Sequence, residues 1–307
     1  MRAYRGIRRS GILSSMDSSA PAALVMRAPA KINLTLDVLG KRPDGYHALR
    51  SVMQALDWHD TLQLEPVSDL LFDCDVPALA GDANLVPRAA RLLQEETGCA
   101  RGARLTLRKG IPVEAGLGGG SSDAAASLLG LNRLWDLGLP PTRLAELGAR
   151  LGSDVPFFLY APTALVSGRG EVVEALTPPP AAHVVLHKPA IGISTARVFR
   201  SLQPGDYGDG LGTERLVAAL RAGAPPEEWP LSNGLQEAAA ALYPEVAAAL
   251  RLLRRAGAPH ALMTGSGSTV YALFARESDA RSVYDRLRAD GHGAVLTRTA
   301  TAGPLSA

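Results

Sequence analysis

The order of apolar and polar residues in the first half of the chain predicts strands mixed with helices. Apolar and polar residues alternate with a period of two, typical of strands, over residues 30–39, 51–64 and 104–109. Apolar residues recur at helical spacing over residues 84–97, where Gly98 ends the pattern, and along an alanine-rich run that ends near Leu134. A proline, an aspartate and a glycine at 43–45 predict a turn between the first two strands.

The same patterns continue through the second half. We expect a helix capped by Thr142 and ending at Arg150, and then a hairpin with arms at 157–166 and 171–176. Strands are predicted near residues 183–187, 261–263 and 269–274, and helices near 213–221, 233–241, 244–256 and 278–290. Three prolines at 178–180 cannot continue a helix or a central strand. They predict a boundary between domains at 26–177 and 178–300, flanked by a disordered extension at 1–25 and a tail at 301–307.

Residues 112–124, P-V-E-A-G-L-G-G-G-S-S-D-A, place four glycines and two serines at the start of the alanine-rich helix. Glycine has no Cβ, so the backbone can adopt positive φ and bring its N–H groups close to a ligand. Ser121 and Ser122 are suited to cap the helix, whose N-terminus favours an anion. The segment predicts a phosphate site made of these serines and of Gly116, Gly118, Gly119 and Gly120. The alternative is a flexible surface turn with an ordinary cap.

The glycine spacing excludes the commoner nucleotide-binding motifs. G-x-G-x-x-G fits no register, because the sixth residue is Ser121 when counting starts at Gly116 and Asp123 when it starts at Gly118. A Walker A motif ends in Gly-Lys-Ser or Gly-Lys-Thr, yet the next lysine in the chain is Lys188. The sequence also has no H-R-D or D-F-G triplet, which excludes protein kinases.

Composition limits the class of protein further. Of the 307 residues, 47% are hydrophobic, which is ample for one large or two modest domains. The net charge of +2 is spread along the chain without a basic tract, so we expect no nucleic-acid partner. Cys74 and Cys99 are the two cysteines and form no C-x-x-C motif. They favour a reducing cytoplasm over a disulfide framework or a thiolate zinc site.

The first residues predict neither secretion nor a membrane anchor. No apolar run approaches the roughly 18–20 residues that cross a bilayer. Residues 1–23 carry four arginines early and small polar residues afterwards, without the apolar core of a signal peptide. Met16 and Met26 precede the first predicted strand, so the segment is either an extension or the product of an upstream start codon.

Three separated stretches resemble the GHMP kinase superfamily. They are A-P-A-K-I-N-L-T-L-D-V-L-G-K-R-P-D-G-Y-H at 28–47, the glycine-rich segment, and M-T-G-S-G-S-T-V-Y at 263–271. Within it, R-P-D-G-Y-H and L-G-S-D-V-P-F-F at 151–158 are similar to kinases of the non-mevalonate isoprenoid pathway that act on cytidine diphosphate methylerythritol. The resemblance implies a two-domain α+β fold. Its N-terminal domain would hold a left-handed βαβ unit and the phosphate loop, and its C-terminal domain an α/β sandwich.

The resemblance assigns roles to three residues around the reaction. Asp154 matches the carboxylate that takes the proton of the acceptor hydroxyl, and Lys31 matches the lysine beside it. Asn33 lies two residues after Lys31, so strand alternation places both side chains on one face and makes Asn33 a candidate substrate contact. The alternatives are a turn cap for Asp154, an exposed strand lysine, and a structural hydrogen bond for Asn33.

Four further residues match the part of the family site that binds cytosine. Tyr46 corresponds to a ring that stacks on the base, and His47 to an imidazole that bonds its edge. Phe199 aligns with an aromatic on the other side of the base, and Thr195 with a nearby substrate contact. The alternatives are a hairpin end for the Tyr-His pair and a helix core position for Phe199.

Two other groups complete the site that the resemblance implies. Pro112 and Leu117 join the glycines and serines of the ATP-binding segment. Gly265, Ser266 and Gly267 match a motif that packs on the glycine-rich segment at 112–124, called the glycine loop below, and helps to close the site. The alternative for this motif is a turn between strands without ligand contact.

The implied reaction is ATP-dependent phosphorylation of the 2-hydroxyl of the methylerythritol unit, giving the 2-phosphate and ADP. ATP implies Mg²⁺, for which the sequence offers only Ser122 as a candidate contact. We expect a cytoplasmic enzyme, a monomer or weak homodimer, with no nucleic-acid or membrane partner. Two alternatives stay open: another GHMP kinase, acting on mevalonate, homoserine or a sugar, and a non-catalytic nucleotide-binding protein of the same fold.

Overall fold

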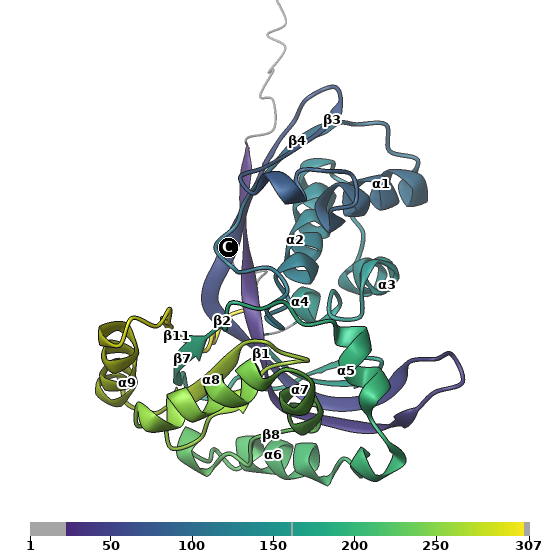
Figure 1. Ribbon diagram of the computed structural model, residues 1–307. Helices are drawn as coiled ribbons and strands as arrows, with labels where there is room; N and C mark the ends of the chain where they lie inside the picture. Colours follow the sequence, from purple (N-terminus) through teal and green to yellow (C-terminus); the bar gives the residue numbers. More distant parts are fainter. Residues whose placement is uncertain (1–22, 161, 304–307) are drawn as a thin grey trace, which may run out of the picture.

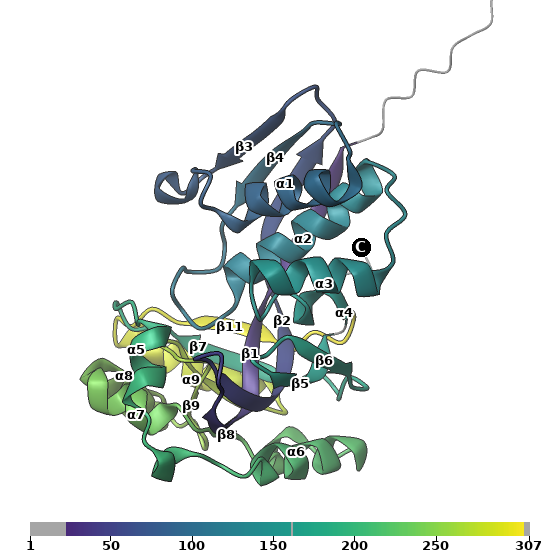
Figure 2. The same ribbon diagram turned by 90° about the vertical axis from the view of Figure 1, so that its right-hand side faces the viewer.

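A long hairpin runs through both parts of the molecule. The computed structural model describes residues 23–160 and 162–303. Strands β1 (Leu24–Lys41) and β2 (His47–Glu65) pair in antiparallel fashion over nearly their whole length, and Figures 1 and 2 show them passing from one unit into the other. Most of the expected extension at 1–25 and of the tail at 301–307 lies outside the described residues, although β1 already begins at Leu24.

The hairpin is the centre of a sheet with seven described strands, in the order β3-β4-β2-β1-β8, with β5 paired to β2 and β6 paired to β5. The added strands are β3 (Leu70–Cys74), β4 (Ala103–Arg108), β5 (Thr163–Gly168), β6 (Val172–Ala175) and β8 (Ser232–Asn233). The three early strands and the turn at 167–170 are confirmed. β1 extends beyond the predicted residues 30–39 at both ends and contains three register shifts against β2.

A crossover unit forms one edge of this sheet. β3 and β4 pair in parallel, and α1 (Leu85–Thr97) connects them. The predicted bounds of α1 are confirmed: the side chain of Asn84 accepts a hydrogen bond from the N–H of Val86, and Gly98 ends the helix with a φ of 67°. The short β3 was not predicted. The left hand of this crossover remains a prediction.

Four helices cover one face of the sheet (Figure 2). Besides α1 they are α2 (Gly119–Leu134), α3 (Pro141–Leu151) and α4 (Phe157–Tyr160). The prediction of a strand at 157–160 is wrong. Phe157, Phe158 and Leu159 are all buried, so their continuous apolar run carries no periodicity that separates helix from strand.

Two helix starts differ from the prediction. Gly118, with a φ of 71°, precedes α2, so Ser121 and Ser122 lie in its first turn and not at its cap. The side-chain cap is replaced by a left-handed backbone position that only glycine adopts easily. α3 follows Pro140 and not Thr142, because Pro141 has the φ of a first helical residue already fixed.

The second unit is a sheet of four antiparallel strands in the order β11-β7-β10-β9, covered by helices (Figure 1). Its strands are β7 (His183–His187), β9 (Leu262–Met263), β10 (Val270–Phe274) and β11 (Val295–Arg298). Its helices are α5 (Thr195–Ser201), α6 (Leu211–Arg221), α7 (Gln236–Leu242), α8 (Pro244–Arg255) and α9 (Glu277–Ala289). Short 3₁₀ turns occur at Pro77–Leu79, Pro204–Asp206 and Pro226–Glu228. Within the described ranges, no helix is long and apolar enough to cross a membrane.

Most elements of the second unit follow the predicted pattern, but its α5 and β11, and β8 of the first sheet, were not predicted. An apolar cluster joins this unit to the hairpin, since Ile32 and Leu34 of β1 pack with Leu186 of β7 and Tyr271 of β10. β8 adds two parallel pairs to β1. The two units therefore share one core across β1. The domain boundary at 177–178 stays a prediction.

A buried group of three charges anchors both ends of the glycine loop. Asp60 of β2 is fully buried, and its Oδ1 accepts the N–H groups of Gly110 and Ile111 at 2.6 and 2.7 Å, just before the loop. Lys109 Nζ donates to Asp60 Oδ2, and also to Asp123 Oδ2 at 2.8 Å, in the first turn of α2. Burial raises the pKa of the Asp123 carboxyl to about 7, against the attraction of Lys109.

We expect Asp123→Asn to change the pH dependence of stability. The unfolded carboxyl titrates near 3.8 and the folded one near 7, so its contribution to stability is complete below pH 3.8 and is lost as the pH rises to 7. The asparagine lacks this loss. The melting temperature of the variant minus that of the wild type should therefore increase by about 2 °C or more between pH 5 and pH 8 in thermal melts. A difference that stays constant over this range contradicts the raised pKa.

Two glycines of the loop provide a matched pair for stability. An alanine Cβ at Gly118 would lie 3.0 Å from Lys31 Cγ and from Phe158 Cζ, at a positive φ, whereas one at Gly120 would meet only Leu85 Cδ1 at 3.9 Å. We expect Gly118→Ala to cost about 1–3 kcal/mol and Gly120→Ala to stabilise α2 by up to about 1 kcal/mol. Denaturant unfolding measures both. Equal changes in the free energy of unfolding for the two substitutions would show that the positive φ at position 118 does not require glycine.

Candidate active site

A cavity of about 600 Å³ lies where the two units meet. Its walls come from β1, the start of β2, the glycine loop, the loop before α4, the β5–β6 turn, α5 and the turn after β9. The polar and aromatic residues that line it include Lys31, Asn33, Tyr46, His47, Ser51, Asp154, Arg169, Thr195, Phe199, Arg200 and Ser266. The fold thus brings together residues predicted from motifs up to 235 positions apart, from Lys31 to Ser266.

Lys31 and Asp154 form the charged pair of the cavity. The Lys31 side chain is 4% exposed, and its Nζ lies 3.5 Å from Asp154 Oδ2. Asp154 is 31% exposed, so its carboxylate faces the open part of the cavity. The backbone N–H of Lys31 donates to Leu117 O at 2.9 Å, which fixes β1 against the glycine loop. This arrangement places a proton acceptor beside a buried positive charge, where a ligand hydroxyl can reach it.

Asn33 shares a face of β1 with Lys31, as strand alternation predicts. Its Oδ1 accepts a hydrogen bond from Lys31 Nζ at 2.8 Å, and its Nδ2 donates to Ser51 Oγ at 2.8 Å. The amide is 1% exposed, so both of its ends are used within the protein. The structural hydrogen bond that was the alternative for Asn33 is therefore present. A substrate contact for this residue stays a prediction.

The glycine loop touches the turn that follows β9. Gly116 has a φ of 73°, and a Cβ there would lie 2.4 Å from Thr264 O and 2.9 Å from Gly267 O. Gly265 approaches the loop from the other side, where a Cβ would lie 3.2 Å from Gly116 O. The two segments approach so closely because neither carries a side chain at these positions. Gly267 contributes to this contact, whereas Gly265 and Ser266 also line the cavity.

The other residues of the predicted phosphate segment lie around the start of α2. Positive φ occurs at Gly116 and Gly118 but not at Gly119 or Gly120, which are the first helical residues, so the expectation of positive φ for those two is wrong. Pro112 and Gly120 are exposed, Ser121 is half-buried, and the Leu117 side chain is buried in the core, which leaves only its backbone for a ligand. Ser122 Oγ is buried and has no hydrogen-bond partner in the described part of the chain.

Aromatic side chains gather at the far end of the cavity. The rings of His47 and Phe199 lie 5.1 Å apart between centroids and are tilted by 31°. Tyr46 is 54% exposed, and the Arg169 guanidinium lies 4.8 Å above its ring. Burial lowers the pKa of His47, which favours the neutral imidazole with one donor and one acceptor nitrogen. In this structure Phe199 thus packs on His47, and Tyr46 on Arg169.

Hydrogen bonds hold the turn after β9 in place. Thr195 Oγ1 and Ser266 Oγ lie 2.7 Å apart, and Asn233 Nδ2 donates to Met263 O at 2.7 Å and to Gly265 O at 2.9 Å. The Tyr271 hydroxyl donates to Asn33 O at 2.7 Å. Sequence reasoning missed Asn233, Ser51 and the support given by Tyr271, because isolated polar residues carry no spacing that marks them.

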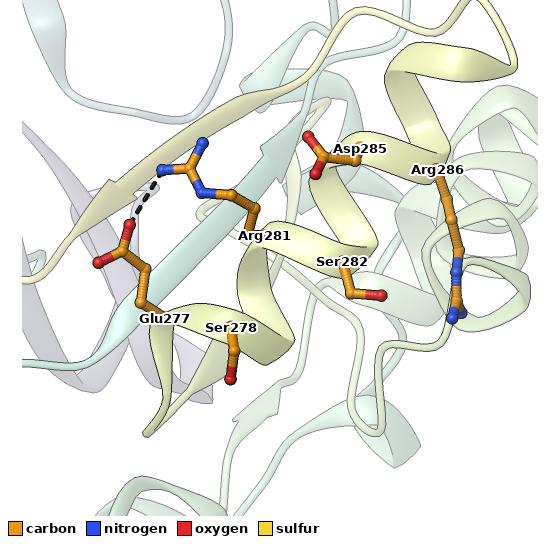
Figure 3. A pocket seen from close by; sticks show the side chains of 6 residues that line it. All are labelled: Glu277, Ser278, Arg281, Ser282, Asp285 and Arg286. Carbon is orange, nitrogen blue, oxygen red and sulfur yellow. Dashed lines mark hydrogen bonds and ion pairs between the residues drawn. The ribbon is translucent and has the colours of Figure 1, made fainter.

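Another hollow, on the surface of α9, differs in character. Figure 3 shows that its lining side chains come from one helix, with Arg281 reaching back to Glu277 in an ion pair of 2.9 Å and Arg286 pointing away. The cavity between the units, in contrast, is lined by residues from several segments that are distant in sequence. No group of three metal-ligating His, Cys, Asp or Glu side chains occurs within residues 23–160 and 162–303. The cavity between the units is therefore the candidate active site.

The sequence and the fold were compared with known proteins. The profile of the GHMP kinases N terminal domain matches residues 84–162, and that of the GHMP kinases C terminal region matches residues 218–293. The 4-diphosphocytidyl-2-C-methyl-D-erythritol kinase of Pelotomaculum thermopropionicum is 47% identical over 278 residues, covering 89% of this chain and 96% of the relative. That of Ralstonia nicotianae is 45% identical over 271 residues, covering 87% and 90%.

A crystal structure of 4-(cytidine 5'-diphospho)-2C-methyl-D-erythritol kinase superposes with a TM-score of 0.78 and 37% identity, covering 90% of this chain and 99% of the other. At 47% identity to a curated relative over nearly the full length of both chains, common descent is clear. The two-domain α+β fold expected from the resemblance is confirmed. The chain belongs to the 4-diphosphocytidyl-2-C-methyl-D-erythritol kinase family of the GHMP kinases.

Proposed function

We propose that the chain transfers the γ-phosphoryl group of ATP to the 2-hydroxyl of 4-diphosphocytidyl-2-C-methyl-D-erythritol, giving the 2-phosphate and ADP in non-mevalonate isoprenoid synthesis. The relatives that carry this name support the reaction. The observation that carries the proposal for this chain is one cavity with a Lys31–Asp154 pair at one end and an aromatic group at the other. The acceptor hydroxyl and the cytosine of the substrate thus have separate places in the same cavity.

Asp154 acts on the acceptor hydroxyl. Its exposed carboxylate accepts the hydroxyl proton and turns the oxygen toward the phosphoryl group for in-line attack. Lys31 keeps the carboxylate charged and stabilises the negative charge that develops on the transferred group. Asn33 holds the ammonium in position through its Oδ1. The phosphoryl group passes through a loose transition state, so positioning and charge account for most of the rate.

The glycine loop and the start of α2 hold the nucleotide phosphates. The backbone N–H groups of the first turn, from Gly119 to Ser121, point out of the helix N-terminus and favour an anion, whereas the N–H of Ser122 already donates to Gly118 O. Pro112 and the backbone of Leu117 complete the loop. The free Ser122 Oγ suits a contact to a phosphate or to Mg²⁺. With no carboxylate cluster in the described ranges, Mg²⁺ would be held mainly by ATP, and it would neutralise charge on the phosphates.

Tyr46, His47 and Phe199 form the site for cytosine. The neutral His47 imidazole can form hydrogen bonds with the edge of cytosine. The rings of Tyr46 and Phe199 can stack on the two faces of the base once His47 moves away from Phe199. Thr195 is held by Ser266 at the rim between the two ends. Gly265, Ser266 and Gly267 close the cavity against the loop. We further propose a cytoplasmic enzyme that acts as a monomer or weak homodimer.

We expect Asp154→Asn and Lys31→Met each to lower kcat by about 100-fold or more, the scale for a proton acceptor or a charge partner. The KM for ATP should change far less, because neither residue belongs to the loop that holds the phosphates. A coupled assay of ADP release measures both constants. Asp285→Asn, on the exposed face of α9, is the control and should leave both unchanged. Turnover near that of the wild type in Asp154→Asn would remove this residue from the mechanism.

The aromatic end of the cavity sets which kinase this is. Tyr46→Ala and Phe199→Ala should each raise the KM for the cytidylated substrate about tenfold or more, the range for loss of base stacking, while the KM for ATP stays nearly constant. The uridine analogue should be a poorer substrate, since it presents an acceptor where cytosine presents a donor. Preferred turnover of mevalonate, homoserine or galactose would disprove the assignment to this substrate.

A further inference from the structure

The charges that line the cavity do not balance. Lys31, Arg169 and Arg200 bring three positive charges, and Asp154 is the single carboxylate of the lining. Lys31 and Asp154 compensate each other at 3.5 Å. Glu171, outside the lining, pairs with Arg169 Nε at 3.6 Å, so Arg200 is the arginine of the lining without a carboxylate partner among the described residues. An excess of positive charge in a partly enclosed cavity favours an anionic ligand group.

Arg169 lies in the β5–β6 turn, between the aromatic group and Asp154. Its guanidinium is stacked on the Tyr46 ring at 4.8 Å, and a Cβ on the next residue, Gly170, would lie 3.7 Å from Asp154 Oδ1. Glu171 holds the turn by accepting the Arg169 N–H at 2.5 Å, and its carboxylate lies 3.6 Å from Arg169 Nε. The guanidinium donates no hydrogen bond within the described part of the chain. Because the Glu171 carboxylate faces Nε, the two terminal nitrogens of Arg169 are the ones that remain available for a ligand.

Arg200 approaches from the other wall. It follows Phe199 in α5, and its Nε donates to Ala196 O at 3.1 Å, which leaves its two terminal nitrogens unused by the described residues. Each arginine is thus next to one aromatic of the proposed cytosine site: Arg169 stacks on Tyr46, and Arg200 follows Phe199 in the chain. An anionic group next to the cytosine of a ligand would therefore lie near both arginines.

We propose that Arg169 and Arg200 bind the diphosphate of the cytidylated substrate, with Arg169 as the main contact. This inference rests on the proposed function, which supplies a ligand with a diphosphate between its base and its acceptor hydroxyl. Guanidinium groups bind phosphate oxygens through paired, charge-assisted hydrogen bonds, and a rigid guanidinium loses little freedom in doing so. Arg169 then fixes the position of the diphosphate between the cytosine and Asp154. A methylerythritol without the nucleotide lacks this contact.

The test compares two ligands that differ only in the diphosphate. Binding of CDP and of cytidine to the full chain is measured by calorimetry, with ADP in excess to fill the phosphate loop. The ratio of the two dissociation constants reports the diphosphate contact, because a merely structural role of Arg169 would weaken both ligands alike. We expect Arg169→Gln to reduce the preference for CDP about tenfold or more, and the double variant with Arg200→Gln to reduce it further.

Two variants serve as controls. Arg169→Lys keeps the positive charge and should restore part of the preference for CDP. Arg197→Gln removes an arginine of the same helix, α5, that is stacked on Tyr243 outside the cavity lining, and should leave the preference unchanged. A CDP-to-cytidine ratio in Arg169→Gln within threefold of the wild type would remove Arg169 from the proposal, and the same result in the double variant would overturn it.

Turnover separates this inference from the function on which it rests. If the wild type does not phosphorylate the cytidylated substrate, the proposed function is wrong, whatever the binding ratios are. If it does, and the double variant keeps both its CDP preference and its KM for that substrate, the reaction stands and the arginine site is wrong. With both correct, the KM for the cytidylated substrate rises in Arg169→Gln and the KM for ATP does not.

Discussion

A buried ammonium group is the constraint around which the site is arranged. Lys31 sits in the shared core with 3% of its surface exposed, and an uncompensated charge there would cost several kcal/mol. Asn33 and Asp154 supply the compensation from two segments that are distant in sequence. Gly118 allows it, since its missing Cβ leaves room for the Lys31 stem at 3.0 Å. The position of the Asp154 carboxylate therefore follows from the need to compensate the charge of Lys31.

A second buried group of charges, Asp60, Lys109 and Asp123, supports the same loop at both of its ends. Asp60 accepts two backbone N–H groups just before the loop, and Lys109 connects it to Asp123 just after. A Cβ on Gly119 would lie 3.3 Å from both Asp60 Oδ2 and Lys109 Nζ. The glycine loop is thus held between two charged groups, and its lack of side chains is needed on its inner side as much as on the side that faces a ligand.

The sequence was informative where a physical pattern is local. Alternation predicted the early strands, Asn84 and Gly98 marked the ends of α1, and strand parity placed Lys31 and Asn33 on one face. It failed where several outcomes share one pattern: the buried run at 157–160 is apolar whether helical or extended, and β8 is too short to show a period. The link between Asn233 and the turn at 263–265, and the stacking of Arg169 on Tyr46, depend on tertiary contacts that no spacing encodes.

The contact between Gly116 and the turn at 264–267 also bears on how the protein becomes active during synthesis. One wall of the cavity comes from β1, near the start of the chain, and the opposite wall comes from a turn that leaves the ribosome about 150 residues after the glycine loop. β10, which carries the Tyr271 bond to β1, follows that turn. The first unit can collapse while the chain is still being made, but its phosphate loop stays open on one side until β9 and β10 are added. A nascent chain therefore lacks a closed site until this turn and β10 have been made, and truncation before residue 271 also removes the Tyr271 bond to β1.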